Sequence, residues 1–234
     1  MPRPHGRDGV ARSTTTGEEA WHFHGEGVDV KKSAASAAAE DFVAILQTGT
    51  LFAIDPDGEL APSGLDRIEI DEELWLVDVA RPWVSSVALT DDAVLLATRA
   101  GRVCSYARDD GEQRWCQPVE GADTGRPMLR ADEELIVVAT PTAVVALEPS
   151  TGAAEWEALS DRRISAMERN DAAIVVGDAA GTVHALDPAS GELRWQTDGL
   201  ARVTTLSLTT DAVYIGAQDG TVARLQPEDG SGGP

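Results

Sequence analysis

The sequence predicts an all-β fold, a β-propeller of five four-stranded blades that forms one domain over residues 17–230. Three observations predict this fold. A unit of constant pattern recurs along the chain, and its last three intervals are 39 to 41 residues, the length of one blade. Within each unit, short apolar runs are bounded by Gly, Asp and Pro, which is typical of strands joined by tight turns. A Trp closes every unit except the last.

The unit is clearest in the run DAAIVVGDAAGTVHALDPASGELRW, in which Gly181 marks the middle. The equivalent positions in the other units are Gly49, Gly101, Thr142 and Gly220. The first interval is longer because an insert at about 60–72 precedes the next Trp. Inner strands of a blade are covered on both faces, which accounts for continuous apolar runs such as 135–139 and 173–176.

The segment 33–47 has a composition that favours a helix, because it is rich in Ala. Its place in the repeat favours two strands instead, since Asp41 aligns with Asp211 and residues 42–46 align with residues 213–217. We therefore predict two strands here. A helix over 34–45 would remove most of the first blade.

The two ends of the chain predict a closed ring. The last unit stops after Gly230 without a Trp, whereas Trp21 and the Gly-Glu pair before it reproduce the end of a unit with no preceding half. If the N-terminal strand completes the C-terminal blade, no sheet edge stays open. Residues 1–16 and 231–234 are then expected to be disordered tails. The alternative is an arc that pairs with a second copy, and we expect a monomer rather than this dimer.

Two units share a spaced motif at their ends. One has Ala185, Asp187, Ser190, Gly191, Glu192 and Trp195, and another has Ala146, Glu148, Thr151, Gly152 and Trp156. In a third unit, Tyr106, Arg108, Gly111, Glu112 and Trp115 match this motif poorly but in register. The pattern resembles the docking motif Ala-x-Asp-x-x-Thr-Gly-Glu-x-x-Trp of PQQ-type propeller repeats, which occur in quinoprotein alcohol dehydrogenases and in the lipoprotein that assists outer-membrane barrel assembly. The resemblance covers about residues 17–230.

The resemblance implies a structural role for the Trp residues, each of which would lie over a turn of the next blade. The docking residues are then Trp21, Trp75, Trp115, Trp156 and Trp195, with Trp83 outside the pattern. The catalytic features of the quinoprotein dehydrogenases do not carry over. Their adjacent cysteines under the cofactor are absent, because Cys104 and Cys116 are twelve residues apart, and we expect no PQQ or other cofactor.

The chain is strongly acidic, with 40 Asp and Glu against 19 Lys and Arg and a formal charge of −21. This charge disfavours nucleic acid and anionic membranes as partners. Scattered acids with almost no Lys are typical of a halophile's protein whose folding needs salt, and an acidic mesophilic protein is the alternative. No apolar run is long enough for a signal peptide or a membrane span, which predicts a cytoplasmic location.

The candidate binding site is the mouth of the central channel, where the innermost strands of a propeller begin. Counting back eighteen residues from each anchor places five residues there: Lys31, Trp83, Thr124, Arg163 and Arg202. Three cations and an aromatic side chain at one level predict an anionic or planar ligand, such as a phosphate, carboxylate or nucleotide. The alternative is that each Arg pairs with a neighbouring carboxylate.

Other residues give weaker signals. His22 and His24 would share one face of a strand, but without a third ligand we expect no metal there. His184 and the two cysteines are expected to be packing residues, although Cys104 and Cys116 flank one hairpin of the same blade and could be neighbours in space. Neither a disulfide framework nor any catalytic residue is predicted. The sequence therefore favours a non-enzymatic interaction or scaffold module that binds another protein or a small anionic ligand. The alternative is an enzyme that acts on a small anionic or sugar substrate in the channel.

Overall fold

The structure is a computed structural model. It describes residues 8–12, 19–24, 35–39, 42–47, 50–54, 73–78, 84–98, 100–160 and 162–232. The described part consists of antiparallel β-sheets and one short 3-10 helix, η1 (Ala122–Thr124), so the all-β prediction is confirmed. The predicted insert at about 60–72 lies outside the described residues.

Four sheets have four strands each, and we call them blades 1 to 4. Blade 1 contains β3 (Ala35–Ala39), β4 (Phe42–Gln47), β5 (Thr50–Ile54) and β6 (Glu73–Asp78). Blade 2 contains β7 (Val84–Leu89), β8 (Ala93–Thr98), β9 (Arg102–Ala107) and β10 (Gln113–Pro118). Blade 3 contains β11 (Met128–Ala131), β12 (Ile136–Ala139), β13 (Val144–Leu147) and β14 (Ala154–Ala158). Blade 4 contains β15 (Ile164–Arg169), β16 (Ile174–Asp178), β17 (Val183–Leu186) and β18 (Leu193–Thr197).

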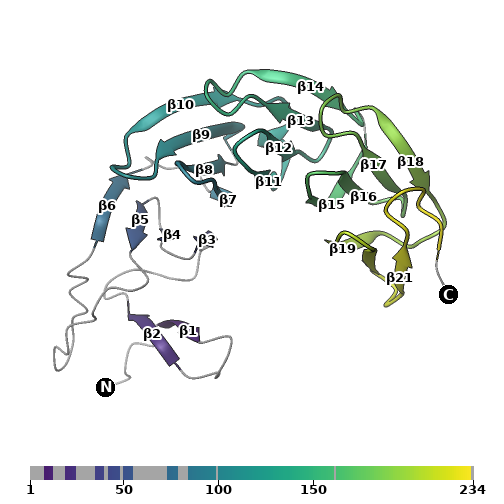
Figure 1. The fold of residues 1–234 in the computed structure, drawn as a ribbon, viewed down its shortest axis with the longest axis horizontal. Coiled ribbons are helices and arrows are strands. Elements are labelled where there is room, and N and C mark those ends of the chain that lie inside the picture. Colours follow the sequence, from purple (N-terminus) through teal and green to yellow (C-terminus); the bar gives the residue numbers. More distant parts are fainter. Residues whose placement is uncertain are drawn as a thin grey trace.

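Two smaller sheets flank these blades. The C-terminal sheet has three strands, β19 (Val203–Leu208), β20 (Val213–Ala217) and β21 (Val222–Leu225). The N-terminal hairpin has two, β1 (Asp8–Arg12) and β2 (Glu19–His24). Figure 1 shows the blades side by side along an arc, with β7, β11, β15 and β19 on its inner side and β10, β14 and β18 on its outer side.

The Ala-rich segment forms strands, as the repeat alignment predicts. β3 and β4 are antiparallel, with Ala38 opposite Val43 and Ala35 opposite Leu46. No helix forms there, because pairing within the sheet outweighs the helix propensity of alanine. The predicted first blade is therefore present.

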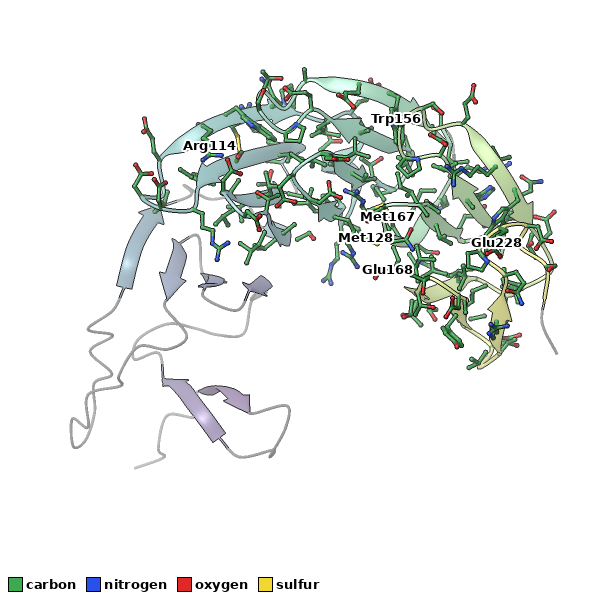
Figure 2. All side chains as sticks on the ribbon, viewed as in Figure 1. Arg114, Met128, Trp156, Met167, Glu168 and Glu228 are labelled. Atoms are coloured by element: carbon green, nitrogen blue, oxygen red, sulfur yellow. A yellow bond between two sulfur atoms is a disulfide. The ribbon has the colours of Figure 1, made fainter. Side chains whose placement is uncertain are left out.

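The core lies between neighbouring blades. All four residues of β12 and all six of β8 are buried, because both faces of these strands are covered. Blade 3 packs on blade 4 through a cluster that includes Val137, Ile174 and Met167. In Figure 2 the labelled Met167 and Trp156 lie in this region. Each blade thus buries its apolar residues against the next one.

The N-terminal hairpin differs from the prediction. Strand β1 lies within residues 1–16, where a disordered tail was expected, and it precedes Trp21, where no strand was expected. Ala11 pairs with Trp21 just before a bulge, as Ala185 pairs with Trp195. The hairpin therefore has the register of the two outer strands of a blade. The sequence signal was weak because DGVAR has only two apolar residues in five.

The C-terminal sheet stops at the start of a fourth strand. Leu225 forms an isolated bridge with Gly232, in the register that pairs Leu186 with Leu193 in blade 4. Residues 231–232 thus have ordered partners, although a disordered tail was predicted for 231–234. Within the described strands β2 pairs with β1 and β21 pairs with β20. Closure of the ring by the N-terminal strand, and with it the count of five blades, stays a prediction.

Candidate functional site

Arg163 and Arg202 occupy the same place in successive repeats. Each stands one residue before the first strand of its sheet. The carbonyl oxygen of Arg163 accepts a 2.8 Å hydrogen bond from the Ala179 backbone, and that of Arg202 accepts one of 2.8 Å from the Gln218 backbone. Arg163 and Arg202 therefore lie at equivalent positions of their repeats, as the prediction of the channel mouth requires. The predicted mouth residues outside the described residues are Lys31 and Trp83.

Thr124 lies in η1, one residue before the position of its repeat that corresponds to Arg163 and Arg202. Met128 pairs with Ala139 in blade 3 as Ala166 pairs with Gly177 in blade 4. Counting back three residues from Met128 gives Gly125, not Thr124, as the equivalent of Arg163. The count from the sequence was wrong here because the turn between β12 and β13 is one residue shorter than the turn between β16 and β17.

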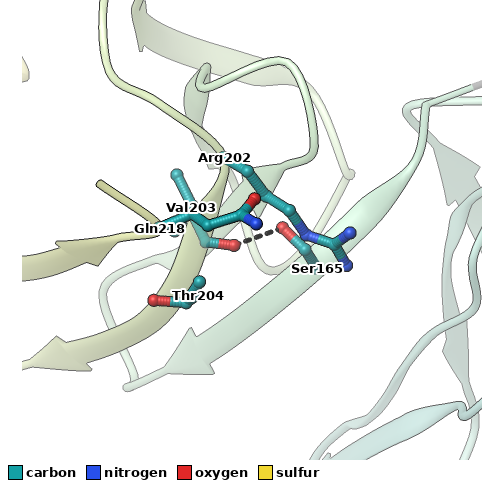
Figure 3. Close-up of a pocket in the computed structure, with 5 residues that line it drawn as sticks. All are labelled: Ser165, Arg202, Val203, Thr204 and Gln218. Carbon is teal, nitrogen blue, oxygen red and sulfur yellow. Dashed lines mark hydrogen bonds between the residues drawn. The ribbon is translucent and has the colours of Figure 1, made fainter. Parts of the chain in front are cut away.

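A pocket of about 310 Å³ opens at Arg202, between blade 4 and the C-terminal sheet (Figure 3). The residues that line it are Ser165, Arg202, Val203, Thr204 and Gln218. The Ser165 hydroxyl donates to the Val203 carbonyl at 2.6 Å and ties β15 to β19. The Thr204 hydroxyl donates to the Gly216 carbonyl at 2.9 Å. Because both hydroxyls are engaged as donors, the side-chain N–H groups of Arg202 and Gln218 are the side-chain donors left for a ligand.

Arg163 and Arg202 are exposed, and neither guanidinium has an ion pair or hydrogen bond with the described residues. Arg162, which precedes Arg163 in the sequence, does have an ion pair, since its Nη1 lies 3.6 Å from the Asp178 carboxylate. In the part of the chain that is described, the carboxylate pairing considered as the alternative is therefore present at Arg162 but not at the two mouth residues. Among the described residues, these two cations therefore have no paired carboxylate, in a chain whose formal charge is −21.

A buried polar pair lies close to this level and was not recognised from the sequence as a pair. His184 Nε2 lies 3.3 Å from Asp178 Oδ2, and the two side chains are 1% and 2% exposed. The other carboxylate oxygen accepts backbone hydrogen bonds from Ala180 at 2.8 Å and Thr182 at 2.9 Å. Burial alone would raise the pKa of Asp178, but the hydrogen bonds from Thr182 and His184 outweigh it and hold the pKa below its usual value. The pair closes the turn between β16 and β17, so His184 is a packed residue, as expected.

Three Trp residues make the same contact with the following repeat. The indole Nε1 atoms of Trp115, Trp156 and Trp195 donate to the carbonyls of Pro149, Pro188 and Pro227 at 2.8, 3.0 and 2.7 Å. A glycine of left-handed conformation, with φ of +70°, lies under each ring at Gly152, Gly191 and Gly230. A Cβ added at any of these glycines would come within 2.5 Å of the indole. Only glycine therefore fits beneath the ring.

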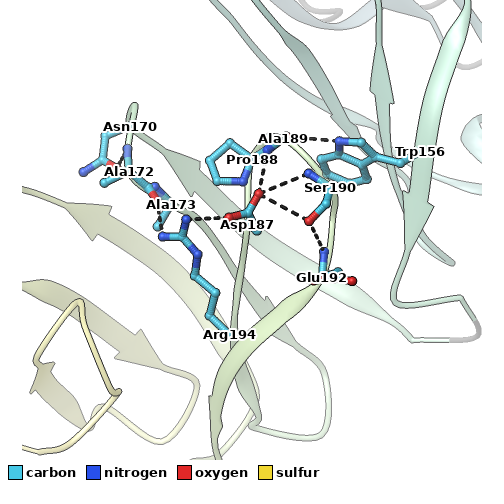
Figure 4. A network of polar contacts seen from close by, with 10 residues as sticks. All are labelled: Trp156, Asn170, Ala172, Ala173, Asp187, Pro188, Ala189, Ser190, Glu192 and Arg194. Atoms are coloured by element: carbon cyan, nitrogen blue, oxygen red, sulfur yellow. Dashed lines mark hydrogen bonds and ion pairs between the residues drawn. The ribbon is translucent and has the colours of Figure 1, made fainter.

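The other motif residues shape the turn that receives the indole (Figure 4). Asp187 Oδ1 accepts backbone hydrogen bonds from Ala189 at 2.9 Å and Ser190 at 3.1 Å. Its Oδ2 lies 2.6 Å from Arg194 Nη2, and this hydrogen bond holds the pKa of Asp187 below its usual value. Glu148 has the same place in blade 3, where hydrogen bonds from Thr151 and Ser150 lower its pKa to about 2. The spacing of the motif is thus the spacing of one hydrogen-bonded turn.

Trp21 and Trp75 have the same backbone position as these three. Trp21 is opposite Ala11 in the N-terminal hairpin, and Trp75 is opposite Ala53 in blade 1. Each of these pairs is followed by a register shift, as at Trp156 and Trp195. In the described strands, the repeat that the sequence predicts from its Trp spacing therefore has one register. In blade 2 the residue opposite Trp115 is Ser105 and not Tyr106, so the sequence alignment of that motif was wrong by one residue.

Cys104 and Cys116 form a disulfide, which corrects the expectation that they only pack. They are directly opposite each other on β9 and β10. The sequence placed the two cysteines on either side of one hairpin, but only the strand register shows that they face each other directly.

Within the described ranges, no group of three or more His, Cys, Asp and Glu residues could hold a metal ion. His22 and His24 lie on β2, and the expected absence of a metal there stays a prediction. None of the helices in the described part of the chain has the length and apolar character needed to cross a membrane.

Comparisons with known proteins agree on the fold. BamB from Moraxella catarrhalis matches with a TM-score of 0.70 and 19% identity over 99% of this chain and 72% of that one. The computationally designed Ika4 protein matches with a TM-score of 0.59 and 21% identity over 66% of this chain and 98% of that one. The designed Ika8 protein has a TM-score of 0.53 and 20% identity over 88% and 74% of the two chains. No curated protein sequence matches the chain.

At these identities the solved structures show the fold alone, which is a β-propeller of PQQ-type repeats. The family model described as outer membrane protein assembly factor BamB matches residues 63–201 and 163–232. These matches cover most of the chain and most of the repeats whose Trp contacts are described above. The chain therefore belongs to the family described as outer membrane protein assembly factor BamB.

Proposed function

We propose that this chain is a non-enzymatic interaction module, a propeller that holds an anionic group of a protein or a small molecule at the pocket beside Arg202. The observation that carries the proposal is the guanidinium of Arg202, which lines that pocket together with Gln218 and has no ion pair or hydrogen bond with the described residues. In an acidic chain, a cation without a carboxylate partner among the described residues is available to an external anion. The family description, which names an assembly factor, supports a protein as the partner.

Phosphate is expected to stabilise the protein through this pocket. At tenfold above its dissociation constant, an anion that binds only the folded state adds about 1.4 kcal/mol. For a chain of this length, that corresponds to a rise in melting temperature of about 3–6 °C. Melting temperature is measured against phosphate concentration in molar KCl, with ionic strength held constant, because the acidic composition predicts salt-dependent folding.

The variant Arg202→Gln should lose this stabilisation. Arg224→Gln is the matched control, because it removes the same charge from the same sheet, and Arg224 donates to the Asp211 carbonyl outside the pocket. The control should keep the phosphate effect. Equal stabilisation of Arg202→Gln and the native chain would contradict the pocket as the site, and stabilisation by phosphate no larger than by chloride would contradict anion recognition.

We also propose that the ring closes as five blades in a monomer, with β2 as the fourth strand of the C-terminal sheet. Two observations support this. The C-terminal sheet has three strands, and β2 carries its Trp at the register of a fourth strand. Strands β1 and β21 both correspond to the third strand of a blade, so β2 can pair with only one of them. Closure therefore requires β2 to leave β1 and pair with β21.

A designed disulfide tests this closure. In blade 4 His184 is opposite Gln196, so in a closed ring His22 faces Ala223. The variant His22→Cys with Ala223→Cys, in a chain whose own cysteines are changed to Ser, should form a disulfide within one monomer. A disulfide-linked dimer would favour the arc that pairs with a second copy. Two free thiols after oxidation would contradict both arrangements.

A further inference from the structure

The disulfide lies at the outer edge of blade 2. Strand β10 is the last strand of its sheet, and β9 is its only neighbour there. Cys104 on β9 is buried, at 6% exposure, whereas Cys116 on β10 is only half-buried. A thiol that approaches from solvent therefore reaches the sulfur of Cys116 first.

Arg102 contacts this sulfur from the start of β9. Its Nε lies 3.2 Å from Cys116 Sγ, and its Nη2 donates to the Cys116 carbonyl at 2.5 Å. The second contact holds the guanidinium beside the sulfur. A cation at this distance stabilises a thiolate, which is the nucleophile and the leaving group in thiol–disulfide exchange.

We propose that Cys104 and Cys116 form a reversible thiol–disulfide site, opened by low-molecular-weight thiols and closed again by low-molecular-weight disulfides, with Arg102 as the residue that positions and stabilises the Cys116 thiolate. The site lies apart from the pocket and does not depend on the proposed function.

The exchange takes place in two steps. The reductant thiolate attacks Cys116 Sγ, a mixed disulfide forms, and Cys104 leaves as a thiolate that takes up a proton. A second reductant thiolate then attacks the reductant sulfur of the mixed disulfide. Cys116 leaves as a thiolate beside Arg102, and the reductant leaves as its own disulfide, so two electrons reach the protein. Oxidation runs the same steps in reverse, with Cys116 as the attacking thiolate.

The protein is expected to stay folded when the disulfide opens. The backbone pairing of β9 with β10 covers five residue pairs and does not depend on the sulfur bond. On either side of Cys116, Trp115 donates to the Pro149 carbonyl at 2.8 Å and Gln117 donates to the Thr151 carbonyl at 3.2 Å. These bonds join β10 to blade 3 and keep the strand in place.

Free thiols in the native chain are counted by maleimide labelling after incubation with dithiothreitol in molar KCl. Both thiols should appear without loss of the folded circular dichroism spectrum, and oxidised glutathione should restore the disulfide. A pair that resists dithiothreitol until the chain unfolds would overturn the proposal, because it would then be a structural disulfide. A chain that unfolds on reduction would overturn reversibility.

The role of Arg102 is tested on the single thiol of Cys104→Ser, with iodoacetamide as the probe. Adding Arg102→Gln should slow alkylation of Cys116 by about five- to tenfold at pH 7 and leave the rate unchanged at pH 10, where the thiol is ionised in both. Arg114→Gln is the matched control, because it removes a charge from β10 while its side chain pairs with Asp92 at 2.5 Å. Equal rates for the two Arg variants at pH 7 would overturn the assignment of Arg102.

Discussion

Replacing Trp115 with alanine is expected to lower the free energy of unfolding by about 3–5 kcal/mol, the range for a large buried aromatic residue. The indole is 7% exposed and packs with Leu95, Val103 and Leu129 between blades 2 and 3. The indole lies directly over Gly152. Because glycine has no side chain, it cannot fill the cavity that forms when the indole is removed. The loss is measured by urea denaturation in molar KCl.

Trp115→Phe separates packing from hydrogen bonding. Phenylalanine keeps much of the apolar area but cannot donate to the Pro149 carbonyl, so we expect a loss of about 1–2 kcal/mol. Trp156→Ala is a second comparison, because the Trp156 indole makes the same bond but is only half-buried. Its loss should be smaller than that of Trp115→Ala. A loss below about 1 kcal/mol for Trp115→Ala would contradict a docking role for this residue.

Replacing Asp178 with alanine is expected to destabilise the protein by about 3–5 kcal/mol at pH 7, as when one partner of a buried pair is removed. The change leaves His184 Nε2 and the backbone N–H groups of Ala180 and Thr182 without their acceptor. It also removes the carboxylate that lies 3.6 Å from Arg162. Among the described residues, no other carboxylate is paired with His184.

The pH dependence of this effect follows from the lowered pKa of Asp178. A carboxylate whose pKa is lower in the folded state stabilises the protein above its unfolded pKa, about 3.9, and loses this contribution as the pH falls through the folded pKa. The difference in free energy of unfolding between the native chain and Asp178→Asn should therefore shrink as the pH falls below about 4. Asparagine keeps an acceptor for the two backbone donors, so its loss should be smaller than that of alanine. A difference that is unchanged at pH 3 would contradict the contribution of the ionised carboxylate.

Much of the fold could be predicted because the signals are local. The spacing of Trp115, Trp156 and Trp195, and the turn residues before each, follow from hydrogen bonds within one turn and from one contact with the next blade. The repeat also decided between helix and strand at 35–47, where residue propensities alone favour a helix. Strand β1 escaped prediction because its pairing is carried by the backbone and not by an apolar pattern.

The positions counted from the anchors agree only in part with the strand register, because the turns differ in length. Counting from an anchor placed Arg163 and Arg202 correctly relative to each other, because their repeats have turns of equal length. The same count failed at Thr124, where the turn is one residue shorter. The pairing of Cys104 with Cys116, and the contact of Arg102 with that sulfur, depend on the register of two strands and could not be derived from spacing.

The sequence by itself determined the repeat, most of the strands and the spacing of the Trp residues, because each follows from residue types at short and regular intervals. Only the tertiary structure decided which side chains meet. It buried Asp178 with His184, left Arg202 without a carboxylate among the described residues, and joined the two cysteines. The physical reason is that such contacts depend on strand register and on the packing of one blade against the next, and a change of one residue in a turn alters both.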